Sequence, residues 1–287
     1  MHWIFTDNLS PFIWHTTFNA EAHPILARIA LFIWHTNFNG SDLGIRWYGA
    51  AYLLGFVLVY LFYRAAALRH DIPGFEIADV DSLTIRVIAG VMLGGRLGFV
   101  LQHPVKLLHD PLFIFRIWEG GMAYFGGLAG VILAEWSFAR MKHISILAFT
   151  DIMSVVAALG LGIGRIANFV NGELYGTLTH SDWGVIFQGG GPQPRHPSQL
   201  YECASHLLLF AILFYLAKRW RGRVRPGAIS FLYLILYGVF RFFTDFYRQD
   251  DVYWMGISDG QWVSLAIAAG GAIALFAWSR QRGRSGA

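Results

Sequence analysis

The sequence contains little cysteine and little charge. One of its 287 residues is a cysteine, which excludes an internal disulfide and a metal site built from several cysteines. Charged residues make up only 14% of the chain, and no lysine-rich stripe offers a surface for nucleic acid. Long low-complexity linkers are also absent from the sequence. We therefore predict one main domain, with no metal, no cofactor and no nucleic-acid partner.

Hydrophobic residues, by contrast, are abundant. They make up 55% of the chain, and the mean hydropathy of +0.46 is typical of membrane proteins. About 20 apolar residues are needed to cross a hydrocarbon core of about 30 Å. We predict an all-α integral membrane protein with seven transmembrane helices, near residues 44–63, 83–102, 121–139, 146–169, 198–217, 227–243 and 260–279. The stretch from Pro24 to Trp34 is shorter and contains Arg28, which predicts an interfacial helix.

Basic residues predict how these helices are oriented. More than half of the 22 Lys and Arg residues fall in segments 64–82, 140–145, 218–226 and 280–287. The positive-inside rule places these segments in the cytoplasm and the N-terminus outside. We accordingly predict a periplasmic N-terminal cap at 1–43, a transmembrane domain at 44–280 and a cytoplasmic tail at 281–287. No basic region precedes a cleavable apolar stretch, so the first span is expected to direct insertion.

Two segments on the predicted outer side are distinctive. FIWHTTFN (Phe12 to Asn19) recurs as FIWHTNFN (Phe32 to Asn39), and we interpret both copies as aromatic interfacial anchors. Residues 170–197 are rich in glycine and form a long connection between spans, which favours an arm or lid over a site.

Ionisable groups at membrane depth are costly, so they are candidate functional residues. Four polar clusters fall at the outer ends of the predicted spans, which allows them to converge. They are Arg165, Asn168, Asn171 and Glu173; Arg195, His196, Ser198, Gln199, Tyr201 and Glu202; Tyr237, Arg241, Asp245 and Arg248; and Arg46 with Tyr48. Two arginines in one cavity suit a phosphate, because a guanidinium binds phosphate oxygens bidentately. Glu173, Glu202 and Asp245 are each able to orient an arginine or to transfer a proton.

Three other polar residues receive separate interpretations. Arg96, on the second span, is predicted to reach the outer cluster. Glu135 and Asp151 are close in sequence to Arg140 and Lys142, which predicts local ion pairs near the cytoplasmic side.

The stretch GRIANFVNGELYG, from Gly164 to Gly176, resembles the signature of the prolipoprotein diacylglyceryl transferase family. Other stretches match family blocks in the same order: RWYG (46–49), LGGRLGFVL (93–101), WEGGMAYFGGLAGV (118–131), RHPSQLYE (195–202) and YGVFRFFTDFYRQ (237–249). The resemblance covers about residues 44–280.

The resemblance implies a seven-span enzyme of the bacterial inner membrane. Such an enzyme transfers the diacylglyceryl group of phosphatidylglycerol to the thiol of the lipobox cysteine, near the signal peptide of a prolipoprotein, and releases glycerol 1-phosphate. Negative charge grows on the departing phosphate, and preorganised cations stabilise it. The predicted catalytic residues are Arg165, Arg241, Glu173, Tyr237 and His196. The predicted substrate-binding residues are Tyr48, Asn168, Asn171, Gly176, Arg96, Asp245 and Arg248.

Three positions depart from the family pattern. Many relatives carry a histidine in an HGGL motif where this chain has Phe125, and a phenylalanine cannot accept a proton. Arg46 replaces a frequent histidine, and Asp245 replaces a frequent glutamate. A free thiol has a pKa near about 8.5, so the reaction needs a proton acceptor. The candidates left open are Glu173, His196, Tyr237 and Tyr124.

Two other functions remain open from the sequence. A lipid or anion transporter would use the same arginines as a binding site, although transporters usually show two related halves and this chain shows only one short internal echo. An inactive paralogue that binds lipoprotein precursors would explain Phe125. The sequence does not indicate an oligomeric state.

Overall fold

The structure, a computed structural model, describes residues 5–6, 12–17, 42–116, 121–249 and 252–280. The predicted interfacial helix at 24–34, the second aromatic copy and the tail at 281–287 lie outside the described residues. The chain divides into two compact units. Unit 1 comprises residues 1–53, 163–203 and 247–249, and unit 2 comprises residues 54–162, 204–246 and 250–287.

Seven helices of 18 to 25 residues occupy the seven predicted positions within the described part of the chain. They are α2 (Trp47–Leu68), α3 (Ile77–Leu101), α5 (Tyr124–Lys142), α6 (Ile146–Val170), α7 (Ser198–Trp220), α8 (Ala228–Asp245) and α9 (Asp259–Arg280). Two short elements follow α3, namely α4 (Pro104–His109) and the 3-10 helix η1 (Pro111–Phe115).

Six of these seven helices are long and apolar enough to cross a membrane. The exception is α5, whose 19 residues include Glu135, Arg140 and Lys142. The sequence prediction of an integral membrane protein is therefore supported, while the seventh span stays a prediction.

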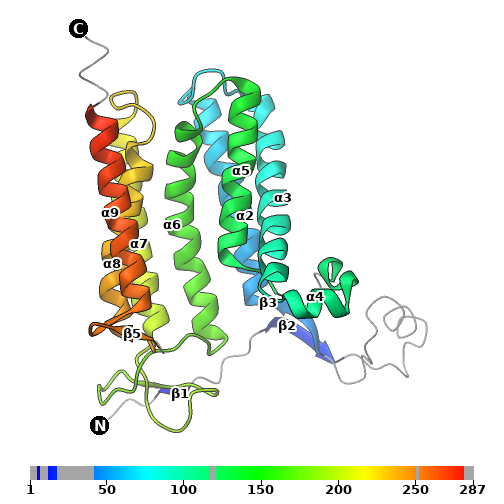
Figure 1. Cartoon of the computed structure of the whole chain (residues 1–287), viewed down its shortest axis with the longest axis vertical. Helices are drawn as coiled ribbons and strands as arrows, with labels where there is room; N and C mark the ends of the chain where they lie inside the picture. Colours follow the sequence, from blue (N-terminus) through cyan, green and yellow to red (C-terminus); the bar gives the residue numbers. More distant parts are fainter. Residues whose placement is uncertain (1–4, 7–11, 18–41, 117–120, 250–251, 281–287) are drawn as a thin grey trace. The chain divides into compact units, whose positions relative to one another are not determined.

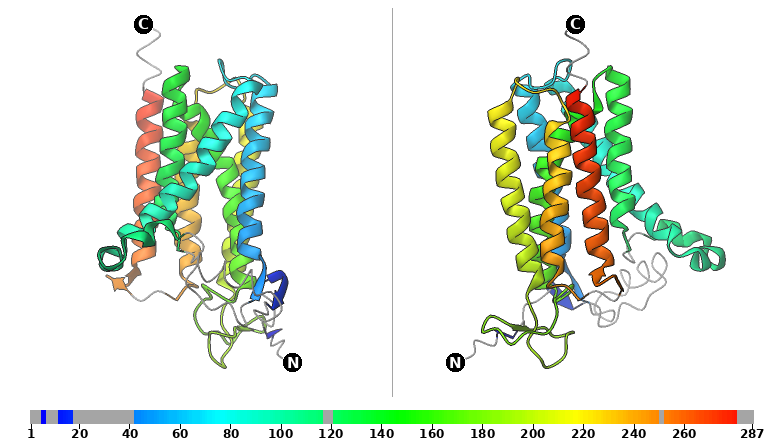
Figure 2. Two further views of the ribbon diagram at one scale, coloured as in Figure 1. Left: turned by 90° about the vertical axis from the view of Figure 1, so that its right-hand side faces the viewer. Right: turned by 60° about the vertical axis from the view of Figure 1, so that its left-hand side comes forward.

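Glycines bring α5 against α3 in unit 2, and the two helices run side by side in Figures 1 and 2. A Cβ atom added to Gly90 would collide with the carbonyl of Gly130, and one added to Gly98 would lie 2.9 Å from the Cα of Gly126. Small residues of this kind allow helix backbones to pack closely in lipid. Helices α8 and α9 form a second close pair in the same unit (Figure 1), where Gly238 faces Ala268.

The core of unit 2 centres on buried aromatic rings. Phe149 makes edge-to-face contacts with Phe75 at 5.2 Å and with Phe138 at 5.6 Å between ring centroids. Tyr63, which is fully buried, completes the cluster. Edge-to-face packing of this kind adds stability beyond the buried area.

The predicted local ion pairs of Glu135 and Asp151 are wrong. Glu135 is 1% exposed and accepts a hydrogen bond of 2.6 Å from the Tyr63 hydroxyl. It lies five residues before Arg140, a spacing that places the two side chains on different faces of α5. Lys142 instead pairs with Asp79 at 2.5 Å.

Asp151 caps another helix. Its carboxylate accepts the N–H groups of Gly227 and Ser230, each at 2.7 Å, at the start of α8. These N–H groups lack partners within α8, and a carboxylate also complements the positive end of the helix dipole.

Short strand pairs accompany the helices. β1 (Phe5–Thr6) pairs in parallel with β4 (Val185–Ile186), and β2 (Phe12–Thr17) pairs antiparallel with β3 (Asp42–Arg46). β5 (Tyr253–Trp254) and β6 (Ile257–Ser258) form a hairpin before α9. The first aromatic copy thus supplies β2, and its interfacial role stays a prediction.

Candidate functional site

The signature stretch folds as a helix end followed by a tight turn. Helix α6 ends at Val170, and the N–H of Glu173 donates to the carbonyl of Asn168 at 3.1 Å. Gly172 has φ +65°, a left-handed conformation that closes helix ends and favours glycine. The asparagine-glycine-glutamate sequence thus turns the chain directly after the helix and returns Glu173 toward its last turn.

Glu202, near the start of α7, joins two arginines in unit 1. Its Oε2 lies 2.6 Å from Nε of Arg165, and its Oε1 lies 2.9 Å from Nη1 of Arg248. The Glu202 side chain is 2% exposed, whereas those of Arg165 and Arg248 are 20% and 17% exposed. A buried carboxylate therefore holds two cations that each keep some accessible surface.

Amide groups extend this network to Glu173. Arg165 Nη1 donates to Asn168 Oδ1 at 3.2 Å, and Asn168 Nδ2 donates to Glu173 Oε1 at 2.8 Å. Asn171 Nδ2 donates to the same oxygen at 3.3 Å, and Gln199 Nε2 donates to the Glu173 carbonyl at 2.7 Å. The structure thus brings together four predicted residues of the signature, Arg165, Asn168, Asn171 and Glu173.

Gly176 lies between two backbone segments. Its N–H donates to the carbonyl of His196 at 2.9 Å, and the next N–H, of Thr177, donates to the carbonyl of Tyr247 at 3.0 Å. An added Cβ atom would collide with the Tyr247 carbonyl oxygen. The position therefore requires glycine for packing, and its predicted substrate-binding role stays a prediction.

His196 belongs to an aromatic group in unit 1. Its ring meets Tyr247 edge-on at 5.1 Å between centroids, and its Nδ1 lies 3.2 Å from the Tyr201 hydroxyl. That hydroxyl accepts a hydrogen bond of 2.9 Å from Trp183 Nε1. Partial burial lowers the pKa of the His196 imidazole from its ordinary value of 6.5, so the ring is neutral at neutral pH.

Arg195 anchors the connection between α6 and α7 rather than facing the network. Its Nε donates to the carbonyl of Gly190 at 2.9 Å, its Nη1 donates to Gln249 Oε1 at 2.8 Å, and its guanidinium covers the Tyr175 ring. The predicted arm at 170–197 is thus an internally bonded segment, and its function as a lid stays a prediction.

Arg241 has a separate partner in unit 2. Its Nη2 lies 2.7 Å from Oδ1 of Asp245, one turn further along α8, and the Asp245 side chain is fully buried. Ser258, directly before α9, donates its hydroxyl proton to the other Asp245 oxygen. These contacts favour Asp245 as the residue that orients Arg241.

The predicted polar stripe on α8 is confirmed as helical only as far as Asp245. Tyr237, Arg241 and Asp245 share that helix at a spacing of four, but Arg248 lies beyond its end and pairs with Glu202 in unit 1. The predicted convergence of the two key arginines joins residues of different units and stays a prediction.

Tyr237 stacks between two rings of unit 2. Tyr233 lies 5.7 Å away with an interplanar angle of 20°, and His206 lies 5.8 Å away at 13°. His206 is 5% exposed. The stacking fixes the Tyr237 ring through neighbours on α7 and α8.

Arg96 is surrounded by backbone carbonyls. It is 4% exposed and donates to the carbonyls of Phe113, Ile114 and Gly121. Its guanidinium also lies 4.7 Å from the Phe113 ring centroid. These contacts anchor η1 to α3, and a substrate-binding role for Arg96 stays a prediction.

Two other predicted positions lie at helix starts. Tyr48 is the second residue of α2, and its side chain lies outside the described part of the structure. Phe125 is the second residue of α5 and is 70% exposed, next to Tyr124 at 54%.

Sequence reasoning named Glu202 as able to orient an arginine, which the structure confirms, but it gave no specific role to Gln199 and did not name His206. Glu202 connects two arginines, Gln199 binds the backbone at Glu173, and His206 stacks on Tyr237. The available signal was the spacing of Gln199, Glu202 and His206, which places them along one face of α7. Among the described residues, no group of three or more His, Cys, Asp or Glu side chains is arranged to hold a metal ion.

Arg165 has guanidinium N–H donors that its described contacts do not use. A guanidinium carries five N–H groups, and the described contacts of Arg165 use its Nε and one of its Nη1 groups. Its orientation is fixed by Glu202, and its side chain is 20% exposed. Such a group is preorganised to bind an anion with two or more oxygens.

Comparisons with known proteins agree with this chemistry. The profile of the prolipoprotein diacylglyceryl transferase family matches residues 36–278. The phosphatidylglycerol–prolipoprotein diacylglyceryl transferase of Oleidesulfovibrio alaskensis is 45% identical over 227 residues, which are 78% of this chain and 83% of that protein. The protein of the same name from Pseudoalteromonas atlantica is 42% identical over 254 residues, 85% of this chain and 88% of that protein. The chain therefore belongs to the prolipoprotein diacylglyceryl transferase family.

Proposed function

We propose that this chain transfers the diacylglyceryl group of phosphatidylglycerol to a cysteine thiol of a prolipoprotein. The observation that carries the proposal is the Arg165 guanidinium, oriented by Glu202 and Asn168 with anion-binding donors left over. Family membership, which covers most of the chain, supplies the identity of both substrates.

The reaction exchanges one bond to carbon. The substrate sulfur attacks the glyceryl carbon that carries the phosphate, a carbon–sulfur bond forms, and the carbon–oxygen bond breaks. Glycerol 1-phosphate leaves with the bonding electrons and takes up negative charge. Arg165 is placed to stabilise this charge, and Arg241, oriented by Asp245, is the proposed second cation.

The substrate thiol must lose its proton, and Glu173 is the proposed acceptor. Glu173 is exposed, and the amides of Asn168 and Asn171 bond only its Oε1, which leaves Oε2 available. His196 is less suited. Its Nδ1 lies 3.2 Å from the Tyr201 hydroxyl and is already engaged in that hydrogen bond, whichever of the two groups donates.

The membrane arrangement is also proposed. Adding α5 to the six apolar helices gives seven spans in the bacterial inner membrane. The basic segments at 64–82, 140–145, 218–226 and 280–287 then face the cytoplasm, and residues 1–43 form a periplasmic cap. With this orientation the ends of α6 and α8 that carry Arg165 and Arg241 lie at the outer leaflet, where the lipobox cysteine would be presented.

The proposal is tested with purified protein in phosphatidylglycerol micelles and a lipobox peptide. Mass spectrometry should show one added diacylglyceryl group per peptide, with one glycerol phosphate released. Arg165→Ala or Arg241→Ala should lower the rate at least about 100-fold, as expected for losing a preorganised charge partner. Arg86→Ala, which removes a cation bonded only to Met141 sulfur among the described residues, is the matched control and should keep the rate.

Other outcomes would identify the alternatives. Phosphatidylglycerol binding without product in the wild type would indicate an inactive paralogue. Movement of the lipid between leaflets of a vesicle without peptide modification would indicate a transporter.

A further inference from the structure

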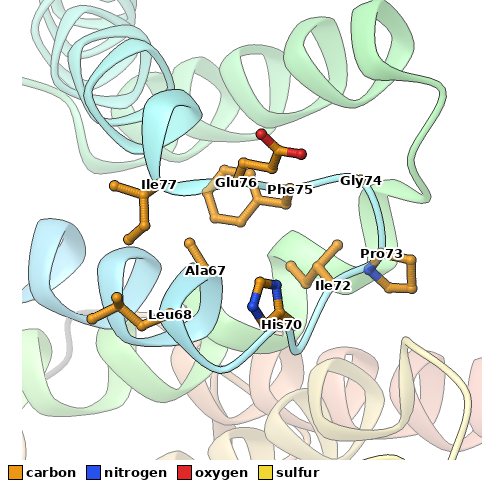
Figure 3. Close-up of a pocket in the computed structure, with 9 residues that line it drawn as sticks. All are labelled: Ala67, Leu68, His70, Ile72, Pro73, Gly74, Phe75, Glu76 and Ile77. Carbon is orange, nitrogen blue, oxygen red and sulfur yellow. The ribbon is translucent and has the colours of Figure 1, made fainter.

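Two adjoining pockets lie at the C-terminal ends of α2 and α7, and they share no residue with the signature network. The first has a volume of about 320 Å³ and is mainly apolar, with Leu68, Ile72, Phe75 and Ile77 in its wall (Figure 3). The second has a volume of about 500 Å³ and is mainly basic. We call them the apolar pocket and the basic pocket. His70 lines both, so the two volumes meet at its side chain.

The basic pocket carries an excess of positive charge. Its charged lining residues are Arg69, Asp71, Lys218, Arg219, Arg221 and Arg223. Asp71 is its only carboxylate and is already engaged by Arg221 and, at 3.1 Å, by Arg69. Lys218, Arg219 and Arg223 have no carboxylate partner within the described residues. The pocket therefore carries a net positive charge that suits an anion.

The wall between the pockets is held in a strained conformation. His70 has φ +52°, which is unfavourable for a residue with a side chain. The turn is fixed by hydrogen bonds from the N–H of His70 to Ala67 at 3.1 Å and from the N–H of Asp71 to Ala66 at 2.9 Å. Glycine is the usual residue at such a helix end. A histidine in its place at the junction of two pockets is a reason to look for a ligand.

The apolar pocket indicates what kind of anion fits. Leu68 and Ile77 are 53% and 46% exposed at its edge, and Figure 3 shows the Glu76 carboxylate pointing away from His70. A small inorganic anion would leave this apolar surface unused. A phospholipid with net negative charge would use both pockets, because its phosphate and its acyl chain are joined in one molecule.

We propose that the two pockets together bind one anionic phospholipid that is not the substrate. Its phosphate lies among Lys218, Arg219 and Arg223, and the upper part of one acyl chain lies against Leu68 and Ile77. Both pockets belong to segments whose charge predicts the cytoplasmic side, where anionic lipids attract basic groups near the membrane surface. The site is independent of the transfer reaction.

The test compares lipids by native mass spectrometry of the full chain in neutral detergent. Phosphatidic acid, phosphatidylcholine with the same chains, and inorganic phosphate are the three ligands. The Arg165→Ala background removes the main phosphate donor of the signature network. We expect phosphatidic acid to bind at least about tenfold more tightly than phosphatidylcholine, a difference of about 1.4 kcal/mol.

The variant Arg219→Gln/Arg223→Gln should reduce this preference to about threefold or less. The matched control Arg140→Gln/Arg225→Gln removes the same charge from predicted cytoplasmic segments outside both pockets and should keep the preference. Leu68→Asn should weaken phosphatidic acid several-fold while the preference over phosphatidylcholine remains. In the otherwise wild-type chain, Arg219→Gln/Arg223→Gln should transfer diacylglyceryl groups within about twofold of the normal rate, which also shows that it folds.

Three results would overturn the proposal. A pocket variant that keeps its full preference for phosphatidic acid would show that the lipid binds elsewhere. A control variant that loses the preference to the same extent would show a general charge effect. Competition by inorganic phosphate at the same concentration as the lipid would show a simple anion site.

Discussion

The two key arginines are held in different ways, although the family resemblance gives them similar roles. Arg165 is oriented by Glu202, a residue on another helix that also binds Arg248. Arg241 is oriented by Asp245 on its own helix, and Asp245 is fixed by Ser258 at the start of α9. Glu202 thus connects three segments of unit 1, whereas Asp245 sets one side chain within unit 2. Each unit thus uses a carboxylate to orient an arginine. In unit 1 the carboxylate is distant in the chain, and in unit 2 it lies four residues away on the same helix.

The largest expected effect comes from neutralising the two carboxylates. Glu202→Gln should lower kcat/KM about 100-fold and the free energy of unfolding by about 3 kcal/mol, because two partly buried cations lose their partner. Asp245→Asn should cost only about tenfold in kcat/KM, because Asp245 holds one arginine whereas Glu202 holds two. Initial rates with a lipobox peptide and thermal unfolding measure both quantities. Asp81→Asn, at an exposed position on α3, is the control. Equal losses of kcat/KM and stability in Glu202→Gln and Asp245→Asn would show that the two carboxylates hold their arginines in equivalent ways.

Two glycines, one in each unit, allow the packing around the two arginine sites to be compared. A Cβ atom at Gly176 meets the backbone carbonyl of Tyr247, whereas one at Gly260 meets the Asp245 carboxylate at 2.5 Å. Gly176→Ala should therefore destabilise the fold by about 2 kcal/mol, since backbone cannot move aside cheaply. Gly260→Ala should mainly displace Asp245 and reduce the rate. Gly189→Ala, which meets nothing within 4 Å, is the control. A fully stable Gly176→Ala variant would contradict the structure here.

A smaller effect is expected from the titration of His196 in unit 1. Partial burial lowers the pKa of His196 below 6.5, so the unfolded chain binds more protons than the folded chain as the pH falls below 6.5. The contribution to stability is complete above pH 6.5 and is lost progressively below it. His196→Gln should therefore reduce the fall in melting temperature between pH 7.5 and pH 5.5. An unchanged slope would show that His196 does not titrate in this way.

The smallest expected effect concerns the missing motif histidine. Phe125→His should change kcat/KM by no more than about twofold, because the proposed proton acceptor is Glu173. Phe125→Asn controls for polarity at this exposed position. A tenfold gain with histidine alone, about 1.4 kcal/mol of barrier, would show that this position supplies a base in this scaffold.

The positions of the long helices were predictable from sequence within a few residues, because apolar length and the neighbouring glycines and prolines define them. The signature network was predictable in part, since Arg165, Asn168 and Glu173 are close in the chain and a helix end brings them together. The pairing of Glu202 with both Arg165 and Arg248 was not predictable. Nothing in the local sequence shows which of several arginines a carboxylate far away in the chain will contact.

Arg96 has structural contacts that the sequence did not reveal. A buried arginine on an apolar helix suggests a ligand, but the carbonyls that surround it belong to η1 and to Gly121. Irregular backbone exposes carbonyl groups that need donors, and sequence patterns do not reveal where such a segment will pack. The pairs β1–β4 and β5–β6 were missed for a related reason, since two-residue strands leave no periodic signal.

The contact between α3 and α5 has a consequence for how the protein is made. Helix α5 carries Glu135, Arg140 and Lys142 and is not among the six helices that are long and apolar enough to cross a membrane, yet Gly126 and Gly130 fit it against the backbone of α3, which precedes it in the chain. In the proposed seven-span arrangement α3 reaches the membrane before α5 during synthesis, so we expect α3 to act as a docking partner that assists the insertion of α5. A bulky residue at Gly90 or Gly94 would block this contact with α5. We expect its first effect to be failed membrane insertion of α5, followed by degradation of the chain.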